Sequence, residues 1–371
     1  MTRYRHRDGE LLVHADDCDS IRAELAGFGY HQDGAAGPVR RFTGTRPVPE
    51  VLAGLREPRL VAPNHVFGAD RIIWNQLRPM PTTDELTPVP AGAIRRYVGV
   101  IDTGIVLHDG RPHPFLGDRV RYEPEDTARV VRDDHGDPVG TAGHGTFVAG
   151  VVLKYLPADV GVRMKGVIDE QSGLTEDLAV ANAIDDLGAE GVTLINMSFS
   201  GETFEDEPPK AIEDALRRLP AETVVVASAG NRGLRQRVYP AGIRFGRTFD
   251  GDPDDGRHAR VLSIGSTDRT RKVADFSNYG PWIAAYADGV EVLGPYFHPG
   301  YPSPPPEAPP FNGYAVWSGT SFSAAIVTGR IAAVMATGKS ARDAATEVLK
   351  AEDPITVYDV NGSLDVPYVR G

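Results

Sequence analysis

The chain has 371 residues, of which 41% are hydrophobic and 24% are charged, and its formal net charge is −12. This composition is typical of a globular protein and provides for one large domain and a small one, while the negative charge argues against nucleic acid or an anionic membrane as the main partner. The only cysteine, Cys18, excludes an intrachain disulfide. No stretch has the length of a membrane span, and no apolar segment follows the charged N-terminus, which predicts a cytoplasmic location.

The first 68 residues alternate short apolar runs with amphipathic segments, which predicts a small α/β module. Strands are expected at 10–15, 39–42 and 59–67, and helices at 19–28 and 48–55. Residues 69–95 are rich in proline, and this composition favours an extended linker. The linker prolines are Pro79, Pro81, Pro88 and Pro90.

From residue 96 to residue 371, apolar runs alternate with helical patterns. Strands are expected at 98–101, 160–167, 192–199, 223–229 and 261–266, and helices at 144–153, 176–188, 208–219, 321–337 and 340–350. Such alternation indicates a mainly parallel sheet covered by helices on both faces. The predicted fold class is therefore a three-layer α/β domain preceded by the small α/β module.

Three polar side chains stand at the ends of these elements. Asp102 ends a buried strand in Val-Ile-Asp-Thr-Gly, at the edge where α/β sheets place their chemistry. His144 opens a helix in His-Gly-Thr-Phe-Val-Ala-Gly, and Ser321 opens another in Gly-Thr-Ser-Phe-Ser-Ala, with its hydroxyl at the positive end of the helix dipole. Acid, imidazole and hydroxyl make a nucleophilic triad. Taken singly, Asp102 is also interpretable as a turn residue and Ser321 as a helix cap.

These three blocks, in the order Asp, His, Ser, resemble the active-site blocks of the subtilisin-like serine peptidases, or subtilases, over about residues 95–338. The resemblance implies a subtilisin-like fold in which Ser321 is the nucleophile, His144 its general base and Asp102 the group that orients the imidazole. A fourth segment, Val-Val-Val-Ala-Ser-Ala-Gly-Asn, ends at Asn231. The resemblance implies that Asn231 and the backbone N–H of Ser321 bind the oxyanion, although Asn231 alone is also typical of a turn.

The resemblance further implies that substrate binds as an extended strand along exposed backbone edges. The implied substrate-binding residues are Ser198, Phe199, Ser200, Gly201, Ala229, Gly230, Arg232 and Val238. Val238 stands where many relatives have glycine, and its side chain would shorten the pocket for the residue before the cleaved bond. Arg232 stands where relatives often have an acidic residue, so it favours an acidic substrate side chain unless it points into water. We therefore expect a restricted preference for small or acidic residues.

Residues 1–68 are comparable in size to the subtilase pro-domain, which folds against the catalytic domain and inhibits it. The last strand of that pro-domain resembles Val-Ala-Pro-Asn-His-Val-Phe at 61–67. Intramolecular inhibition of a zymogen by residues 1–68 is therefore expected, and a permanent module or an unrelated fold are the alternatives. A cut that released the module would fall between Phe67 and Arg95.

The predicted function is that of a serine endopeptidase that forms an acyl-enzyme on Ser321, with a dedicated role such as maturing a precursor peptide. A peptide ligase or macrocyclase that uses the same acyl-enzyme and a non-catalytic peptide-binding module are left open. No cofactor is required and no metal ligand is assigned. Calcium stays open because Asp133, Asp134 and Asp137 form an acid-rich segment, but they match no dedicated calcium loop.

Overall fold

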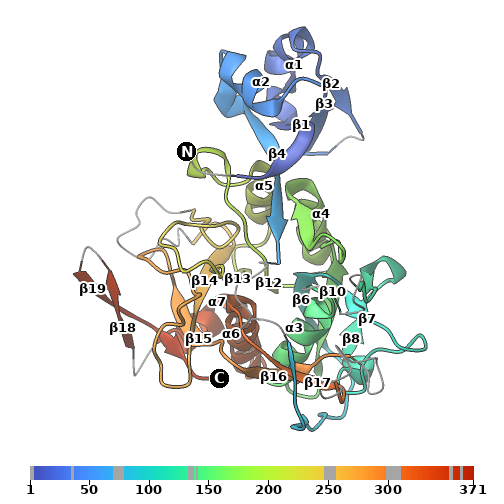
Figure 1. Cartoon of the computed structure of the whole chain (residues 1–371), viewed down its shortest axis with the longest axis vertical. Helices are drawn as coiled ribbons and strands as arrows, with labels where there is room; N and C mark the ends of the chain where they lie inside the picture. Colours follow the sequence, from blue (N-terminus) through green and yellow to red (C-terminus); the bar gives the residue numbers. More distant parts are fainter. Residues whose placement is uncertain are drawn as a thin grey trace.

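The computed structural model describes residues 4–34, 37–69, 79–132, 138, 141–245, 256–297, 311–350, 354–359 and 362–371. Figure 1 shows a small N-terminal unit above a larger body, and one long strand reaches from the first into the second. Among the described residues, none of the helices combines the length and the apolar character that a membrane crossing needs.

The N-terminal unit is an antiparallel sheet covered on one face by two helices. Its strands are β1 (His6–His14), β2 (His31–Asp33), β3 (Val39–Thr43) and β4 (Val61–Gly68), and its helices are α1 (Cys18–Gly27) and α2 (Val48–Gly54). Leu11 and Val13 of β1 pack with Ile21 of α1 and Val51 of α2 in one apolar cluster. The strand predicted at 59–67 begins later, at Val61, because a 3-10 turn opened by Pro58 precedes it.

The larger body is built on a sheet whose described strands all pair in parallel, in the order β20-β15-β14-β13-β12-β6-β10-β8. These strands are β6 (Arg96–Asp102), β8 (Val120–Arg121), β10 (Val160–Gly166), β12 (Leu194–Met197), β13 (Val224–Ser228), β14 (Arg260–Thr267), β15 (Ala285–Asp288) and β20 (Tyr368–Val369). The valine- and isoleucine-rich sequences of β6, β13 and β14 are typical of strands that are buried on both faces.

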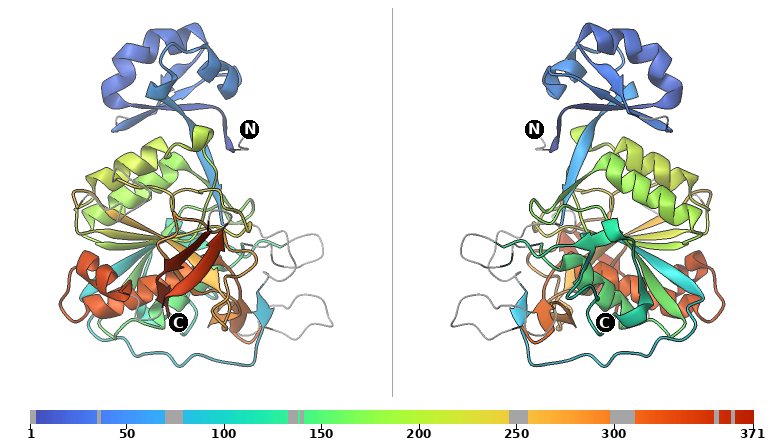
Figure 2. Two further views of the ribbon diagram at one scale, coloured as in Figure 1. Left: turned by 90° about the vertical axis from the view of Figure 1, so that its left-hand side faces the viewer. Right: turned by 90° about the vertical axis from the view of Figure 1, so that its right-hand side faces the viewer.

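Helices cover both faces of this sheet, as the two side views in Figure 2 show. One layer contains α3 (His144–Leu153), α6 (Thr320–Met335) and α7 (Ala341–Val348), and the other contains α4 (Asp177–Ala189) and α5 (Lys210–Arg218). Apolar side chains on the two faces form two separate buried clusters. The predicted three-layer α/β fold is therefore confirmed.

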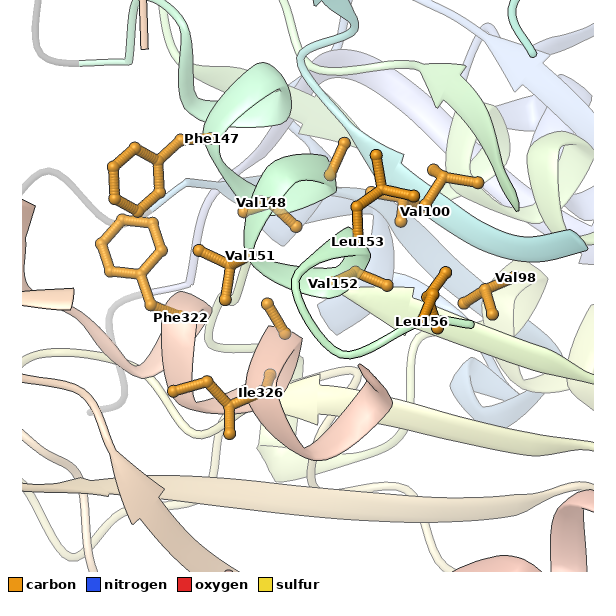
Figure 3. Close-up of a cluster of buried hydrophobic side chains, with 14 of the residues drawn as sticks. Val98, Val100, Phe147, Val148, Val151, Val152, Leu153, Leu156, Phe322 and Ile326 are labelled. Atoms are coloured by element: carbon orange, nitrogen blue, oxygen red, sulfur yellow. The ribbon is translucent and has the colours of Figure 1, made fainter. Parts of the chain in front are cut away.

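The helices α3 and α6 pack directly against each other. Figure 3 shows Val148 and Val151 of α3 near Phe322 and Ile326 of α6. The rings of Phe147 and Phe322 lie 4.7 Å apart. Both aromatic residues stand near the first residue of their helix, so this packing brings the beginnings of α3 and α6 together.

Several short elements were not predicted. Besides β2, β8, β15 and β20, they are β5 (Met80–Pro81), β7 (Ile105–Val106), β9 (Thr127–Ala128), β11 (Leu174–Glu176), β16 (Val292–Pro295), β17 (Tyr314–Trp317), β18 (Ile355–Asp359) and β19 (Gly362–Val366). Part of the predicted linker lies against the larger body, since β5 pairs with β17 and the amide of Gly92 donates to the carbonyl of Ala158. The predicted boundaries at 68 and 95 stay predictions.

Candidate active site

The structure joins the predicted acid and imidazole by a short hydrogen bond. His144, the first residue of α3, donates from Nδ1 to Oδ1 of Asp102 at 2.7 Å. Asp102 is the last residue of β6, is fully buried, and accepts a second bond from the backbone N–H of Thr103 at 2.7 Å. In a neutral imidazole whose Nδ1 carries the proton, Nε2 is a hydrogen-bond acceptor. A general base requires such a free acceptor nitrogen.

Local backbone features hold the histidine in this position. Gly143 precedes the helix with φ of 76°, and a Cβ there would lie 2.8 Å from Cε2 of Tyr296. A side chain at this position would therefore be strained and would also clash. The amide of Gly145 donates to Oγ1 of Thr103 at 2.9 Å, which ties the first turn of α3 to the end of β6.

Ser321 is the second residue of α6, next to a residue whose ring packs against the same imidazole. Its neighbour Phe322 has a ring 5.6 Å from that of His144, and the ring of Trp317 lies edge-on at 5.5 Å. The Oγ of Ser321 donates to the carbonyl oxygen of Ser198 at 3.1 Å, and Oγ of Ser198 donates to the carbonyl oxygen of Ser321 at 3.0 Å. The hydroxyl proton of Ser321 is thus directed at a backbone carbonyl here, and a rotation about the C–O bond redirects it.

The side chain of Asn231 is oriented by the same helix. Its Oδ1 accepts from the backbone N–H and from Oγ1 of Thr320, each at 2.8 Å. Both Thr320 groups donate hydrogen bonds, so the amide atom that faces them is the oxygen, and Nδ2 is on the other side of the amide. A Cβ built on Gly319 would lie 3.7 Å from that Nδ2, so the amide group is next to the residues that precede Ser321. The N–H groups of the first helical turn have no partner within the helix, which makes this a suitable place for an anion.

Two residues that fix this arrangement were missed by the sequence reasoning. Thr320 orients Asn231 as described, and its Oγ1 also accepts from the backbone N–H of Gly230. Asn278, which is 1% exposed, accepts from the backbone N–H of Arg232 and donates to the carbonyl of Ala229. Asn278 carries no sequence signal, since it is distant in the chain and stands in an ordinary Ser-Asn-Tyr segment.

The predicted edge for a substrate strand is occupied by β4. Ser200 and Gly68 exchange two backbone hydrogen bonds of 2.9 and 3.0 Å, and the other edge of β4 pairs with β11 through residues 66–68. Phe67 is fully buried, with its ring 6.4 Å from that of Phe199. A Cβ on Gly201 would lie 2.8 Å from Cδ1 of Phe67, so the backbone approaches closely there.

The remaining predicted residues line the neighbouring loops. Val238 is 4% exposed, and the residue after it, Tyr239, exchanges backbone hydrogen bonds with Gly201. Arg232 was predicted as a charge that acts on substrate or points into water. In the structure its side chain is 51% exposed and its Nη1 pairs with Oε1 of Glu202 at 2.6 Å; Glu202 was not singled out in the sequence.

Asp133, Asp134 and Asp137, the residues considered for calcium, lie outside the described residues. In the described parts of the chain, no group of three His, Cys, Asp or Glu side chains has the geometry of a metal site.

Comparisons with known proteins agree with this geometry. The model of the subtilase family matches residues 95–351. A thermophilic serine proteinase from Bacillus sp. (strain AK1) is 26% identical over 298 residues, which are 75% of this chain and 63% of that protein. Of solved structures, fervidolysin from Fervidobacterium pennivorans, a keratinolytic enzyme related to subtilisin, matches with a TM-score of 0.65 and 18% identity over 100% of this chain and 61% of that chain. The prenylagaramide maturation protease PagA matches with a TM-score of 0.51 and 22% identity over 70% and 84% of the two chains.

The fold, the acid–imidazole pair and the serine at the start of a helix are those expected of a protein of the subtilisin-like class. The family model covers most of the chain, and this protein therefore belongs to the subtilase family of serine-type endopeptidases. The chain spans 63% of the Bacillus proteinase and 61% of fervidolysin, so the matches describe only part of those proteins.

Proposed function

We propose that this chain hydrolyses peptide bonds through an acyl-enzyme on Ser321. The observation that carries the proposal is the hydrogen bond between His144 and Asp102 directly beside the first turn of α6. Nε2 of His144 accepts the proton of the Ser321 hydroxyl as Oγ attacks the peptide carbonyl, and the imidazolium then protonates the leaving amine. Water next attacks the ester by the same route and restores the hydroxyl. Asp102 stabilises the imidazolium and keeps the imidazole oriented.

The oxyanion that forms in each step is bound by two donors, the side-chain Nδ2 of Asn231 and the backbone N–H of Ser321. Support comes from the fixed orientation of the Asn231 amide, whose oxygen is held by Thr320. Donors that are positioned before the reaction need no reorganisation when charge develops, which is why such groups accelerate acyl transfer.

Substrate binds as an extended strand between β11 and Ser200, with Ser198, Phe199, Gly201, Ala229 and Gly230 lining the approach to Ser321. Support comes from β4, which already makes backbone hydrogen bonds of this type to Ser200 and β11. The preference is restricted to small or acidic residues before the cleaved bond, because Val238 fills space and Arg232 supplies positive charge.

Residues 1–68 inhibit the enzyme in the intact chain. Support comes again from β4, whose last residues occupy the edge that a substrate strand would need. A peptide that adds a strand there has to displace Gly68 from Ser200, and the fully buried Phe67 from its contact with Phe199. The intact chain is thus a zymogen until this strand leaves.

The biological role that we propose is the maturation of a precursor peptide in the cytoplasm. The maturation role is supported by the shared fold with PagA, a protease named for such a reaction, together with the restricted preference. The single cysteine is consistent with a reducing compartment. The proposal requires neither a metal nor a nucleic-acid or membrane partner.

The test uses the full-length chain and its Ser321→Ala variant, each incubated with a fluorophosphonate probe and, separately, with a peptide library. We expect probe labelling and cleavage in the wild type only, slow while β4 occupies the edge and faster as the strand leaves, and each pair of products should exceed the mass of its substrate by one water. Products without added water would indicate a ligase or macrocyclase, and absence of labelling together with peptide binding would indicate a non-catalytic module.

N-terminal sequencing of the aged protein tests the zymogen proposal. A new N-terminus within 68–95 that is missing in Ser321→Ala would support self-processing. An intact chain with full activity would make residues 1–68 a permanent module.

A further inference from the structure

An ion pair connects two loops that carry proposed substrate-binding residues. Glu202 follows Gly201 in the loop after β12, and Arg232 follows Asn231 in the loop after β13. Nη1 of Arg232 lies 2.6 Å from Oε1 of Glu202. The two side chains differ in exposure, because that of Glu202 is 8% exposed and that of Arg232 is 51% exposed. The carboxylate is thus shielded, while the guanidinium is open to solvent on one side.

Both ends of the pair are anchored close to the site. On the side of Glu202, Gly201 exchanges backbone hydrogen bonds with Tyr239, and Ser200 exchanges them with β4. On the side of Arg232, the backbone N–H donates to Asn278, and Asn231 is fixed by Thr320 next to Ser321. The ion pair therefore connects the segment at Ser200, which pairs with β4, to the loop that contains Asn231.

We propose that Glu202 is a specificity-determining residue that sets how strongly Arg232 attracts an acidic substrate side chain. This inference deepens the proposed function and depends on it for the position of the substrate. An acidic side chain must compete with Glu202 for the guanidinium, so the preference for acidic residues is weaker in the wild type than it would be without Glu202. Without the carboxylate, Arg232 presents an uncompensated charge. Without the guanidinium, the shielded carboxylate of Glu202 is unpaired. A shielded carboxylate attracts a cation more strongly than a solvated one does, so a basic substrate side chain should then bind better.

The experiment measures relative kcat/KM for three peptides that differ only in the residue before the cleaved bond, which is Glu, Gln or Lys. The peptides compete in one mixture with the full-length chain, so any inhibition by residues 1–68 scales all rates equally. Glu202→Gln keeps the shape and removes the charge, and we expect it to raise the Glu:Gln ratio about fivefold, the upper end for an exposed ion pair. Arg232→Gln should lower the Glu:Gln ratio and raise the Lys:Gln ratio. The double variant should bring both ratios close to one.

Glu213→Gln is the matched control, because Glu213 also pairs with an arginine, Arg217, at 2.6 Å, but on α5. It should leave all ratios unchanged. Unchanged ratios in Glu202→Gln, or shifts of the same sign in the Glu202 and Arg232 variants, would overturn the inference.

A second readout separates this inference from the peptidase proposal. In the Ser321→Ala background, calorimetry with the same three peptides gives dissociation constants that do not depend on turnover. If the peptides bind but the wild type neither cleaves them nor reacts with a fluorophosphonate, the peptidase proposal fails. The ratio of Kd values for the Glu and Gln peptides, with and without Glu202, still decides whether Glu202 controls the charge at Arg232.

Discussion

The two regions of the molecule cover their sheets in different ways. The central sheet has its own helices on both faces and contributes to two large apolar clusters. The N-terminal sheet has α1 and α2 on one face only. Side chains on its second face, among them Leu12 and Val39, belong to the cluster of the larger body that includes Ala211 and Ile212 of α5.

This difference indicates that the N-terminal unit folds with one face of its sheet and docks with the other. Side chains alternate along a strand, so Leu11 and Val13 complete the core of the unit itself, while Leu12 between them contacts the other region. Release of the unit would expose apolar area on that face and on Phe67. The larger body would lose a strand at β11 and Ser200 but would keep β6, α3 and α6, which position Asp102, His144 and Ser321.

The largest effect is expected in the catalytic region, from Asn231→Ala. Loss of an oxyanion donor lowers kcat about 10²–10³-fold, a magnitude that was measured for such an asparagine in a subtilisin, with much less change in KM. The measurement is steady-state kinetics together with a melting curve. Asn312→Ala, at an exposed position beside β17, is the control and should keep wild-type kcat. An Asn231→Ala enzyme with normal kcat would remove Asn231 from the mechanism.

A substitution on β4 should raise the reactivity of Ser321 rather than lower it. Phe67→Ala removes a fully buried ring from the contact with Phe199. A truncation of this kind typically removes ~3 kcal/mol of packing stabilisation. The equilibrium of β4 should therefore shift about 100-fold toward the undocked state. The rate at which a fluorophosphonate labels Ser321 in the full-length chain should rise accordingly. Phe67→Leu, which keeps most of the apolar volume, should rise far less, and equal labelling in all three proteins would contradict inhibition by β4.

The adjacent leucines Leu11 and Leu12 allow a matched test of the two faces. Both are fully buried, and replacement of either by alanine is expected to cost at least ~2 kcal/mol of stabilisation. Leu11→Ala should weaken the folding of the N-terminal unit, and Leu12→Ala should weaken its docking. Leu11→Ala should speed hydrogen exchange throughout β1 and β3. Leu12→Ala should instead speed exchange in β4 at residues 66–68 and accelerate labelling of Ser321. Identical exchange patterns in the two variants would show that the two faces do not act separately.

The sequence located those parts of the site that depend on local signals. Asp102, His144 and Ser321 each stand where an apolar run meets small residues, so the beginnings of α3 and α6 and the end of β6 could be predicted. Asn278, Thr320 and Glu202 could not be assigned, because their contacts join loops far apart in the chain and no local pattern encodes such a contact.

The same limit applies to the fold. β15, with the sequence Ala-Tyr-Ala-Asp, has no β-branched run, and its strand conformation comes from pairing with β14 and β20. The bonds of β4 to both β11 and Ser200 likewise depend on two segments more than 100 residues further along the chain. The resemblance suggested docking of residues 1–68, but it could not give the register.

The smallest effect for a single step is expected from a change of one pH unit, at most about tenfold, through His65 on β4. His65 is 2% exposed, and its Nε2 accepts from the backbone N–H of Phe204 in the larger body at 3.0 Å. Burial, with a further contribution from the neighbouring His6, lowers the pKa of His65 from 6.5 to about 3. The other ionisable groups here, Arg7 with Glu176 and Glu205, belong to the same contact region.

Because the docked state lowers the pKa of His65, its contribution to docking is fully present above pH 6.5 and is lost as pH falls from there toward 3. The docking equilibrium should weaken by at most about tenfold per pH unit in that window, since one proton is taken up on release. Hydrogen exchange at residues 66–68, corrected for intrinsic rates, should therefore increase as the solution is acidified. His65→Gln offers an acceptor for the Phe204 amide but does not titrate, so it should abolish this pH dependence. A variant that retains the full slope would assign the effect to the other charged groups, and the contrast between a self-contained catalytic region and a releasable N-terminal unit would then not depend on this histidine.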